Sequence, residues 1–176
     1  VNDYNSSSYH CQNFSKKFPS SERKEEMDFM FAYCYYMQSP RYNLDQENTY
    51  KAIDELQFFI TKYGDSDRSN QATKLLFDLN QKIEKKDFEI VKLYYDTGKF
   101  KSTISAVDDF LNRFPETSFL ELIMFIQTQS YYELGKNSIE DKKLQRVKEA
   151  IFACDNFLLD FPEGKYNNEI VNIYEE

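Results

Sequence analysis

The sequence predicts an all-α protein, a solenoid built from stacked helical hairpins. Three observations predict this fold class. Only 4 Gly and 4 Pro occur in 176 residues, which is few for the many turns of a β-sandwich or barrel. Apolar residues recur at steps of three and four along most of the chain, which is the period of one helical face. One short motif also occurs four times, and such repetition indicates a repeat architecture.

The repeated motif is an aromatic residue, three further residues, a second aromatic residue and a helix breaker. It ends four segments: Phe14–Pro19, Phe59–Gly64, Phe110–Pro115 and Phe157–Pro162. Residues four apart lie on one helical face, and the Gly or Pro that follows stops the helix. Aligning the last three copies brings apolar residues into common columns. The alignment therefore predicts that Phe59, Phe110 and Phe157 are equivalent buried residues.

A second signature lies between these motifs. Pairs of tyrosines occur at 35–36, 94–95 and 131–132, and a small residue follows each pair, namely Ser39, Gly98 or Gly135. Two aromatic rings on the last turn of a helix, followed by a small residue, suit a helix that packs and then turns sharply. We expect one tyrosine of each pair in the core and the other on the inner wall of the solenoid. The repeating unit is therefore a helical hairpin.

The hairpins differ in length. Counted from the second tyrosine to the next breaker, the first and third carry about 8 and 10 extra residues, which we expect in their turns, around Ser39–Asn48 and Lys136–Lys143. From Gly64 to Tyr95 the chain runs 31 residues, against 17 from Pro19 to Tyr36. A helical apolar stripe persists through this surplus, so it is predicted to form one long helix.

These signals together predict eight helices in a single array spanning residues 1–176. Their ranges are 3–18, 22–38, 47–63, 69–97, 99–113, 118–134, 142–161 and 166–175. Residues 1–68 form the N-terminal repeats, 69–97 a long connecting helix and 98–176 the C-terminal repeats.

Composition excludes several classes of function. The 22 basic and 30 acidic residues give a net charge of −8, which argues against binding to nucleic acid. No apolar run approaches the roughly 18 to 20 residues that cross a bilayer. Cys11, Cys34 and Cys154 are odd in number and widely spaced, which argues against a disulfide framework and a zinc site. Cys34 and Cys154 fall on apolar faces, so both are predicted to be core residues.

No constellation of residues indicates catalysis. His10 and Cys11 are adjacent, but neighbours on a helix point about 100° apart and do not form a dyad. The acidic residues Glu22, Glu25, Glu26 and Asp28 are predicted to form a solvated helix start rather than a metal site. Lys82, Lys85 and Lys86 are interpreted as mixed surface charge. We therefore expect no catalytic residues, no cofactor and no metal.

Two resemblances narrow the prediction. The pattern Tyr-x-x-Gly-x-Phe at 95–100, followed by an apolar helix closing on Phe-Pro, resembles the tetratricopeptide repeat. Breakers spaced 45, 51 and 47 residues apart exceed the roughly 34 of that repeat. The stretches 32–36, 39–46, 49–57, 88–98 and 137–143 resemble the BamD (YfiO) family of outer-membrane assembly lipoproteins. This resemblance covers nearly the whole chain, and Ser-Pro-Arg-Tyr at 39–42 is its most specific part.

The resemblance implies a right-handed superhelix of tetratricopeptide-like hairpins that acts as a non-enzymatic adaptor. It implies a location at the periplasmic face of the outer membrane, held by a lipidated N-terminal Cys that, with the signal peptide and first helix, is expected upstream of this sequence. The implied partners are the periplasmic domains of the barrel-inserting subunit, other assembly lipoproteins and unfolded outer-membrane proteins. A second hypothesis remains open: a periplasmic tetratricopeptide-type adaptor or sensor in cell-envelope polysaccharide or division machinery.

Two candidate surfaces follow. Phe29, Tyr33 and Tyr36 share a helical face and, with Tyr42, could line a groove for an extended client segment with an aromatic end. Equally, that face could pack on a preceding repeat. The resemblance implies a docking surface for the barrel-inserting subunit in the C-terminal half, and the insertion in the third hairpin offers candidates for it. These candidates are Lys136, Asn137, Glu140, Asp141 and Lys143.

Overall fold

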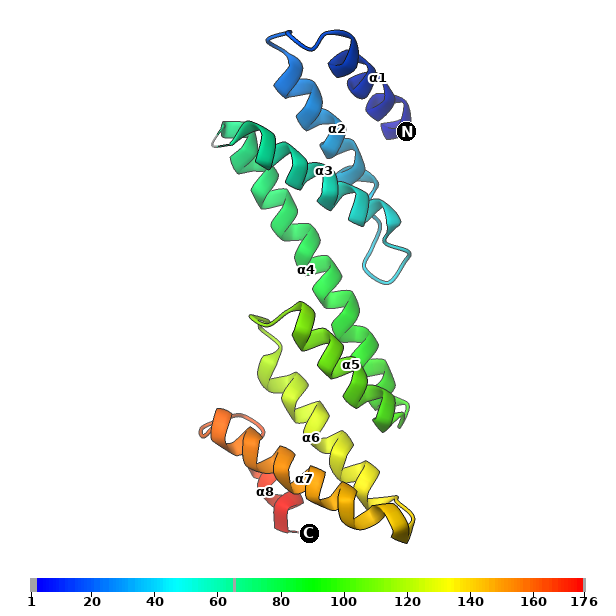
Figure 1. Ribbon diagram of the computed structural model, residues 1–176, viewed down its shortest axis with the longest axis vertical. Helices are drawn as coiled ribbons and strands as arrows, with labels where there is room; N and C mark the ends of the chain where they lie inside the picture. Colours follow the sequence, from blue (N-terminus) through cyan, green and yellow to red (C-terminus); the bar gives the residue numbers. More distant parts are fainter. Residues whose placement is uncertain (1–2, 65, 176) are drawn as a thin grey trace. The chain divides into compact units, whose positions relative to one another are not determined.

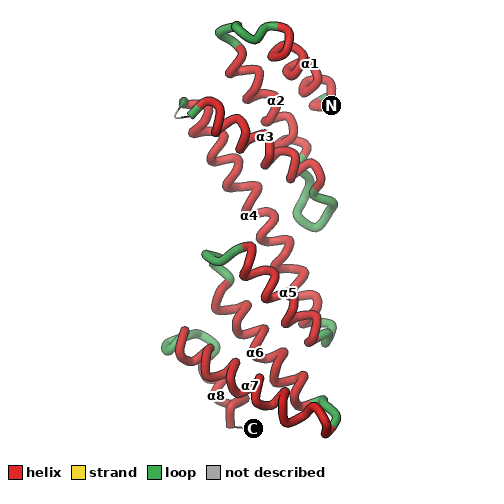
Figure 2. Tube along the Cα trace, in the orientation of Figure 1, coloured by secondary structure: helices red, strands yellow, loops and turns green. Residues whose placement is uncertain are grey.

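A computed structural model describes residues 3–64 and 66–175 of the chain (Figure 1). Within these residues it forms eight helices and no strand (Figure 2). The helices are α1 (Tyr4–Lys17), α2 (Lys24–Gln38), α3 (Glu47–Tyr63), α4 (Asp67–Asp96), α5 (Phe100–Arg113), α6 (Leu120–Lys136), α7 (Glu140–Asp160) and α8 (Asn167–Glu175). All sixteen ends lie within two residues of the predicted ones. The all-α fold class is therefore confirmed.

The chain divides into two compact units, the first ending at Lys86 and the second beginning at Asp87. In the first unit α1 packs on α2, and α2 packs on α3. Its core includes Leu56 and Phe59 from α3 and Leu79 from α4, with small residues such as Ala32 where helices approach closely. The apolar faces predicted from the three-and-four spacing are the faces that meet here.

The second unit has two core clusters. One joins the later part of α4 to α5 and α6, with Val91, Phe110 and Ile123 at its centre. The other joins α6, α7 and α8 through Cys154, Phe157 and Ile170. In this unit α5 packs on α6, α6 on α7, and α8 on both α6 and α7.

The repeat alignment is confirmed at its central residue. Phe59, Phe110 and Phe157 are 1%, 2% and 0% exposed, and each ring contacts the second aromatic ring of its own motif in a tilted arrangement. Cys34 and Cys154 are buried as predicted. The three rings are therefore one structural position used three times.

The tyrosine pairs differ from the prediction. All six rings of these pairs are half-buried. In the pair 94–95 only Tyr95 packs against a core cluster, as predicted, whereas Tyr35 and Tyr36 both do so. The small residue after a pair ends the helix in only two cases. Gly98 has φ +70° and closes α4 with a Lys99-to-Tyr94 backbone hydrogen bond, whereas Gly135 lies inside α6.

The two predicted insertions have different structures. In the first hairpin the extra residues form a loop of eight residues between α2 and α3, as expected. In the third hairpin α6 continues to Lys136 and α7 begins at Glu140, so the turn is only three residues long. The prediction of a long turn at Lys136–Lys143 is wrong, because the extra residues continue the helices and make α7 21 residues long.

None of the helices in the described part of the chain is both long enough and apolar enough to cross a membrane.

Candidate functional site

The aromatic residues predicted on one face of α2 form a continuous ladder. The ring of Phe29 stacks on Tyr33 at 6.0 Å between centroids, and Tyr33 stacks on Tyr36 at 5.9 Å. Steps of four and three residues bring these side chains above one another on a helix. All three rings are half-buried, so each keeps part of its surface for other contacts.

Both ends of the ladder contact helices that follow α2 in the chain. Phe29 packs edge-on against Phe59 of α3 at 5.6 Å. Tyr36 Oη donates a long hydrogen bond of 3.5 Å to Asp78 Oδ2 of α4, and burial together with this carboxylate raises the pKa of Tyr36. Tyr33 lies between them and is outside the core cluster. The ladder is thus anchored at both ends by the unit's own helices, which weakens the alternative that it packs on a preceding repeat.

Tyr42 lies apart from the ladder, in the loop between α2 and α3. Its ring is covered by the ammonium group of Lys85, 4.7 Å from the ring centroid. Such a cation–π contact holds the tyrosine against α4. The structure therefore brings Phe29, Tyr33 and Tyr36 together, whereas the ring of Tyr42 contacts Lys85.

A buried glutamine that the sequence did not single out organises this loop. Gln46 Nε2 donates to the carbonyl oxygens of Arg41, Tyr42 and Leu44 at 2.8, 3.3 and 3.0 Å, and its Oε1 accepts from Thr49 Oγ1 at 2.6 Å. Its buried side chain thereby supplies donors that the loop carbonyls would otherwise lack.

Lysines of α4 hold the loop from the other side. Lys82 Nζ donates to Ser39 Oγ at 2.7 Å, and Lys86 Nζ donates to the carbonyl oxygen of Leu44 at 2.6 Å. Burial lowers the pKa of Lys82. The interpretation of these lysines as surface charge was incomplete, since their partners lie more than 40 residues away in sequence.

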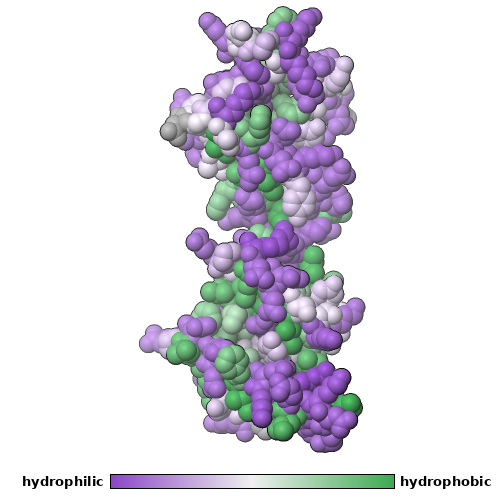
Figure 3. Space-filling view, viewed as in Figure 1, coloured by the Kyte–Doolittle hydropathy of each residue, from purple (hydrophilic) through white to green (hydrophobic). Residues whose placement is uncertain are grey.

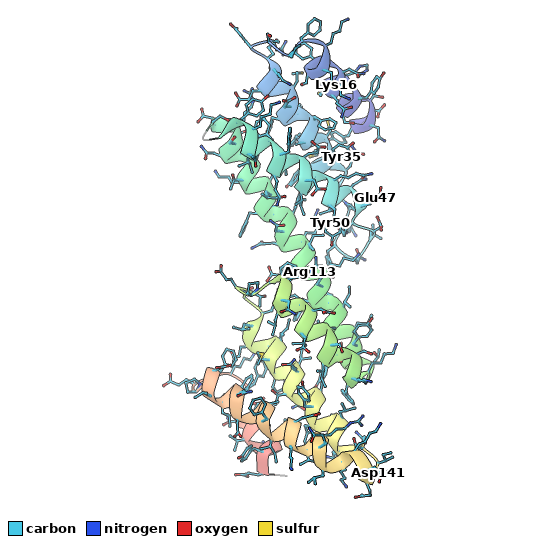
Figure 4. The ribbon with its side chains drawn as sticks, viewed as in Figure 1. Lys16, Tyr35, Glu47, Tyr50, Arg113 and Asp141 are labelled. Carbon is cyan, nitrogen blue, oxygen red and sulfur yellow. The ribbon has the colours of Figure 1, made fainter. Side chains whose placement is uncertain are left out.

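The predicted docking residues gather at the turn between α6 and α7. Lys136 Nζ donates to Tyr132 Oη at 2.7 Å, and Asn137 caps α6 by donating to the carbonyl oxygen of Glu133 at 2.8 Å. Glu140 and Asp141 occupy the first turn of α7, where Figure 4 shows Asp141 at the end of the hairpin. Lys143 Nζ lies 3.7 Å from Glu140, in an exposed pair. The structure thus brings the five residues together as an exposed, mixed-charge hairpin end.

Exposed apolar side chains begin near this turn and continue along α7. Along α7 the exposed apolar residues are Leu144, Val147, Ile151, Phe152 and Leu159. Green patches over the region of α7 are visible in the hydropathy view (Figure 3). Lys136, Lys143, Val147 and Ile151 line a pocket of about 430 Å³ that α6, α7 and α8 form. Charged and apolar surface therefore lie next to each other, as in many protein interfaces.

Asp28 corrects a prediction. It is no solvated helix-start residue, since Asp28 Oδ2 accepts from Lys24 Nζ at 3.2 Å, Lys62 Nζ at 2.6 Å and Tyr63 Oη at 2.6 Å. Burial alone would raise its pKa, but the polar groups of Lys62, Ser15, Tyr63 and Lys24 outweigh burial and lower the pKa to about 2. Only Lys24, four residues earlier, could have been paired with Asp28 from the sequence.

Two cysteines are buried, and the histidine lies at the surface. His10 is exposed and stacks edge-on with Tyr9 at 5.6 Å. Burial raises the pKa of Cys34, and raises the pKa of Cys154 to about 11, which disfavours the thiolate. Across residues 3–64 and 66–175, no three His, Cys, Asp or Glu side chains converge as metal ligands would.

Comparison with known protein families gives one match. The sequence model of the YfiO family, described as an outer membrane lipoprotein, matches residues 1–146 and, in a second match, residues 81–173. The two matches together include the aromatic ladder, the Gln46 loop and the turn between α6 and α7. No curated protein matches the chain.

Proposed function

The chain belongs to the YfiO family of outer membrane lipoproteins, and from this premise we propose that it is a non-enzymatic adaptor in outer-membrane β-barrel assembly. Family membership associates the chain with the outer membrane. The adaptor docks on the periplasmic domains of the barrel-inserting subunit, and it also contacts other assembly lipoproteins and unfolded outer-membrane proteins. The observation that carries this proposal is the family match over nearly the whole chain.

The docking surface in this proposal is the end of the α6–α7 hairpin, comprising Lys136, Asn137, Glu140, Asp141 and Lys143. Its support is exposure next to apolar residues of α7, with charges of both signs that can set the register of a partner. Charge reversal at Lys136 and Lys143 should weaken binding to the partner's periplasmic domains. Reversal of Lys101, an exposed lysine of α5 in the same unit, is the matched control. If both variants bind the partner's periplasmic domains with equal affinity, the docking surface is not at this hairpin end.

The client groove in this proposal is the ladder of Phe29, Tyr33 and Tyr36, with Tyr42 at the adjoining loop. Aromatic faces can stack on the aromatic end of an extended segment at small entropic cost. Affinity is modest, because ordering an unfolded client offsets much of the gain.

Tyr33 is the residue to test, because it lies outside the core cluster, unlike Phe29 and Tyr36. Tyr33→Ser should keep the helical circular dichroism and weaken binding of a labelled peptide from the last strand of an outer-membrane protein. Tyr33→Phe, which keeps the ring, should retain binding. If Tyr33→Ser unfolds the first unit and binding falls only in proportion, the ladder is a packing surface and not a groove.

A further inference from the structure

A polar pocket of about 330 Å³ lies in the first unit among α1, α2 and α3. Ammonium groups, carboxylates and aromatic rings line it together: Lys16, Lys24, Lys62, Asp28, Glu55, Phe31 and Phe58. On α2 its residues step from Lys24 to Asp28 to Phe31, by four and three positions, so they form a face separate from the aromatic ladder. Lys16 projects from α1 (Figure 4).

The second unit contains the same arrangement of helices with different side chains. A shift of 96 positions carries Phe14 to Phe110 and Tyr36 to Tyr132 without insertion, and a shift of 98 carries Phe59 to Phe157. The shift of 96 aligns Ser15 with Leu111, Lys24 with Leu120 and Asp28 with Met124. The shift of 98 aligns Tyr63 with Phe161. Leu111, Met124 and Phe161 pack against the second unit's core. The repeat therefore folds with apolar residues at the positions of Lys24 and Asp28, whereas the position of Lys62 corresponds to Asp160.

Charged side chains are not required to stabilise helix packing at these positions. A buried ion pair is often no more stabilising than well-packed apolar residues of similar volume, because the charges lose their hydration. The cluster does achieve something else: Asp28 holds the ammonium groups of Lys24 and Lys62 at the pocket. An ammonium group has three N–H donors. Lys62 uses one of them on Asp28, so further donors remain for a ligand.

Groups of both signs in the pocket have no partner within the described chain. Lys16 and Glu55 make no hydrogen bond or ion pair with residues 3–64 or 66–175. Burial raises the pKa of Glu55, and the nearby carboxylates Asp54 and Asp28 raise it further. Ser15 is only 8% exposed, and its Oγ forms no hydrogen bond of regular geometry there, although it lies close enough to Asp28 to help lower that pKa.

We propose that this pocket binds a phosphate-and-amine headgroup of the phosphoethanolamine type, carried by a membrane phospholipid. The phosphate lies among Lys16, Lys24 and Lys62, and the Ser15 hydroxyl can donate to it. The amine pairs with Glu55. A simple anion would offer no positive group to the Glu55 carboxylate, and a simple cation would offer no negative group to the three ammonium groups, so a ligand with both charges fits best.

The pocket also offers a place for the apolar part of a lipid. Phe58 lines it and is 62% exposed, with the Lys62 ammonium group 5.7 Å from its ring centroid. Aromatic rings beside lysines suit the boundary between headgroups and acyl chains. The family match is to outer membrane lipoproteins, and a membrane is a source of phospholipid headgroups. The proposal goes beyond the adaptor function and stands whether or not the two docking surfaces are correct.

The test titrates the protein with dihexanoyl-phosphatidylethanolamine below its micellar concentration, followed by amide NMR shifts. Dihexanoyl-phosphatidylglycerol supplies a phosphate without an amine, and O-phosphoethanolamine supplies the headgroup without chains. Lys16→Met and Glu55→Gln should each weaken binding of the ethanolamine lipid about tenfold, as for loss of one charge-assisted hydrogen bond. Both residues lack partners in the described chain, so both variants should fold. Lys17→Met and Glu22→Gln, which do not line the pocket, are matched controls.

Glu55→Gln should also abolish the wild-type preference for the ethanolamine lipid over the glycerol lipid. Equal binding of the two lipids by the wild type would overturn the proposal, and so would unchanged affinity in both pocket variants. If O-phosphoethanolamine binds as tightly as the lipid, the pocket is a headgroup site, but its ligand is not a phospholipid.

Discussion

Phe110 occupies the repeated core position that Phe59 and Phe157 occupy in the other hairpins. Its ring is 2% exposed and contacts Phe114 at 5.1 Å between centroids. Phe110→Ala should lower the free energy of unfolding by about 3 to 5 kcal/mol, the usual cost of truncating a core phenylalanine. Urea denaturation measures this difference. Phe152→Ala removes a ring that is 66% exposed and should cost far less; similar losses for both variants would contradict the repeat alignment.

Asp28 should make the free energy of unfolding depend on pH in the acidic range. Its pKa lies below the ordinary carboxyl value, so the folded state favours the charged form. The contribution, about 2 kcal/mol, is present above roughly pH 4 and is lost as pH falls through about 2. Asp28→Asn should therefore be less stable than the wild type at pH 7, and the gap should narrow steadily below pH 4 in urea titrations. Asp54→Asn, at an exposed position on α3, is the control. A gap that stayed constant down to pH 2 would refute the role of Asp28.

Two glycines, one at the end of α4 and one inside α6, should respond oppositely to an added methyl group. Gly98 has φ +70°, a conformation that costs an L-residue about 1 kcal/mol, and no atom lies within 4 Å of an added Cβ. Gly98→Ala should destabilise by about that amount through backbone strain alone. Gly135 is helical, and its added Cβ would meet the backbone of Arg146 at 3.5 Å, an ordinary contact. Gly135→Ala should be neutral or stabilising, by up to about 1 kcal/mol in thermal melts.

The loop between α2 and α3 should lose its order without its central side chain. Gln46→Ala removes the donor shared by three carbonyl groups of the loop. Because trypsin cleaves after arginine in mobile segments, cleavage after Arg41 should accelerate in this variant. Gln57→Ala, at an exposed position on α3, serves as the control. An unchanged cleavage rate would mean that Lys82 and Lys86 hold the loop without Gln46.

Across the whole molecule, stability should be local. Helical repeats contact mainly their neighbours, so a lesion in one repeat spreads weakly along the array. Phe157→Ala should speed hydrogen exchange in α6, α7 and α8, which share its core cluster or pack on it, and leave α1 to α3 protected. Mass-spectrometric hydrogen exchange measures both regions at once. Uniform loss of protection across the chain would show instead a single cooperative unit.

The amino-acid sequence by itself determined the helices, their order and their repeat. All sixteen helix ends came within two residues because a helix depends on local signals, namely a three-and-four apolar period and a breaker. The burial of Phe59, Phe110 and Phe157 followed from the same period. The shared face of Phe29, Tyr33 and Tyr36 was also predictable, since it needs only helical geometry.

Only the tertiary structure decided which polar groups meet. Asp28 pairs with Lys62 and Tyr63, 34 and 35 residues away, and Lys82 reaches Ser39 across 43 residues. Such partners depend on which faces of different helices pack together, and helical periodicity does not specify this. The insertion in the third hairpin was wrongly predicted as a long turn for a related reason. Extra residues can lengthen a turn or continue its helices, and packing of α7 against α6 and α8 favours the helices. The sequence therefore specifies the elements, and contact between elements specifies the charged pocket.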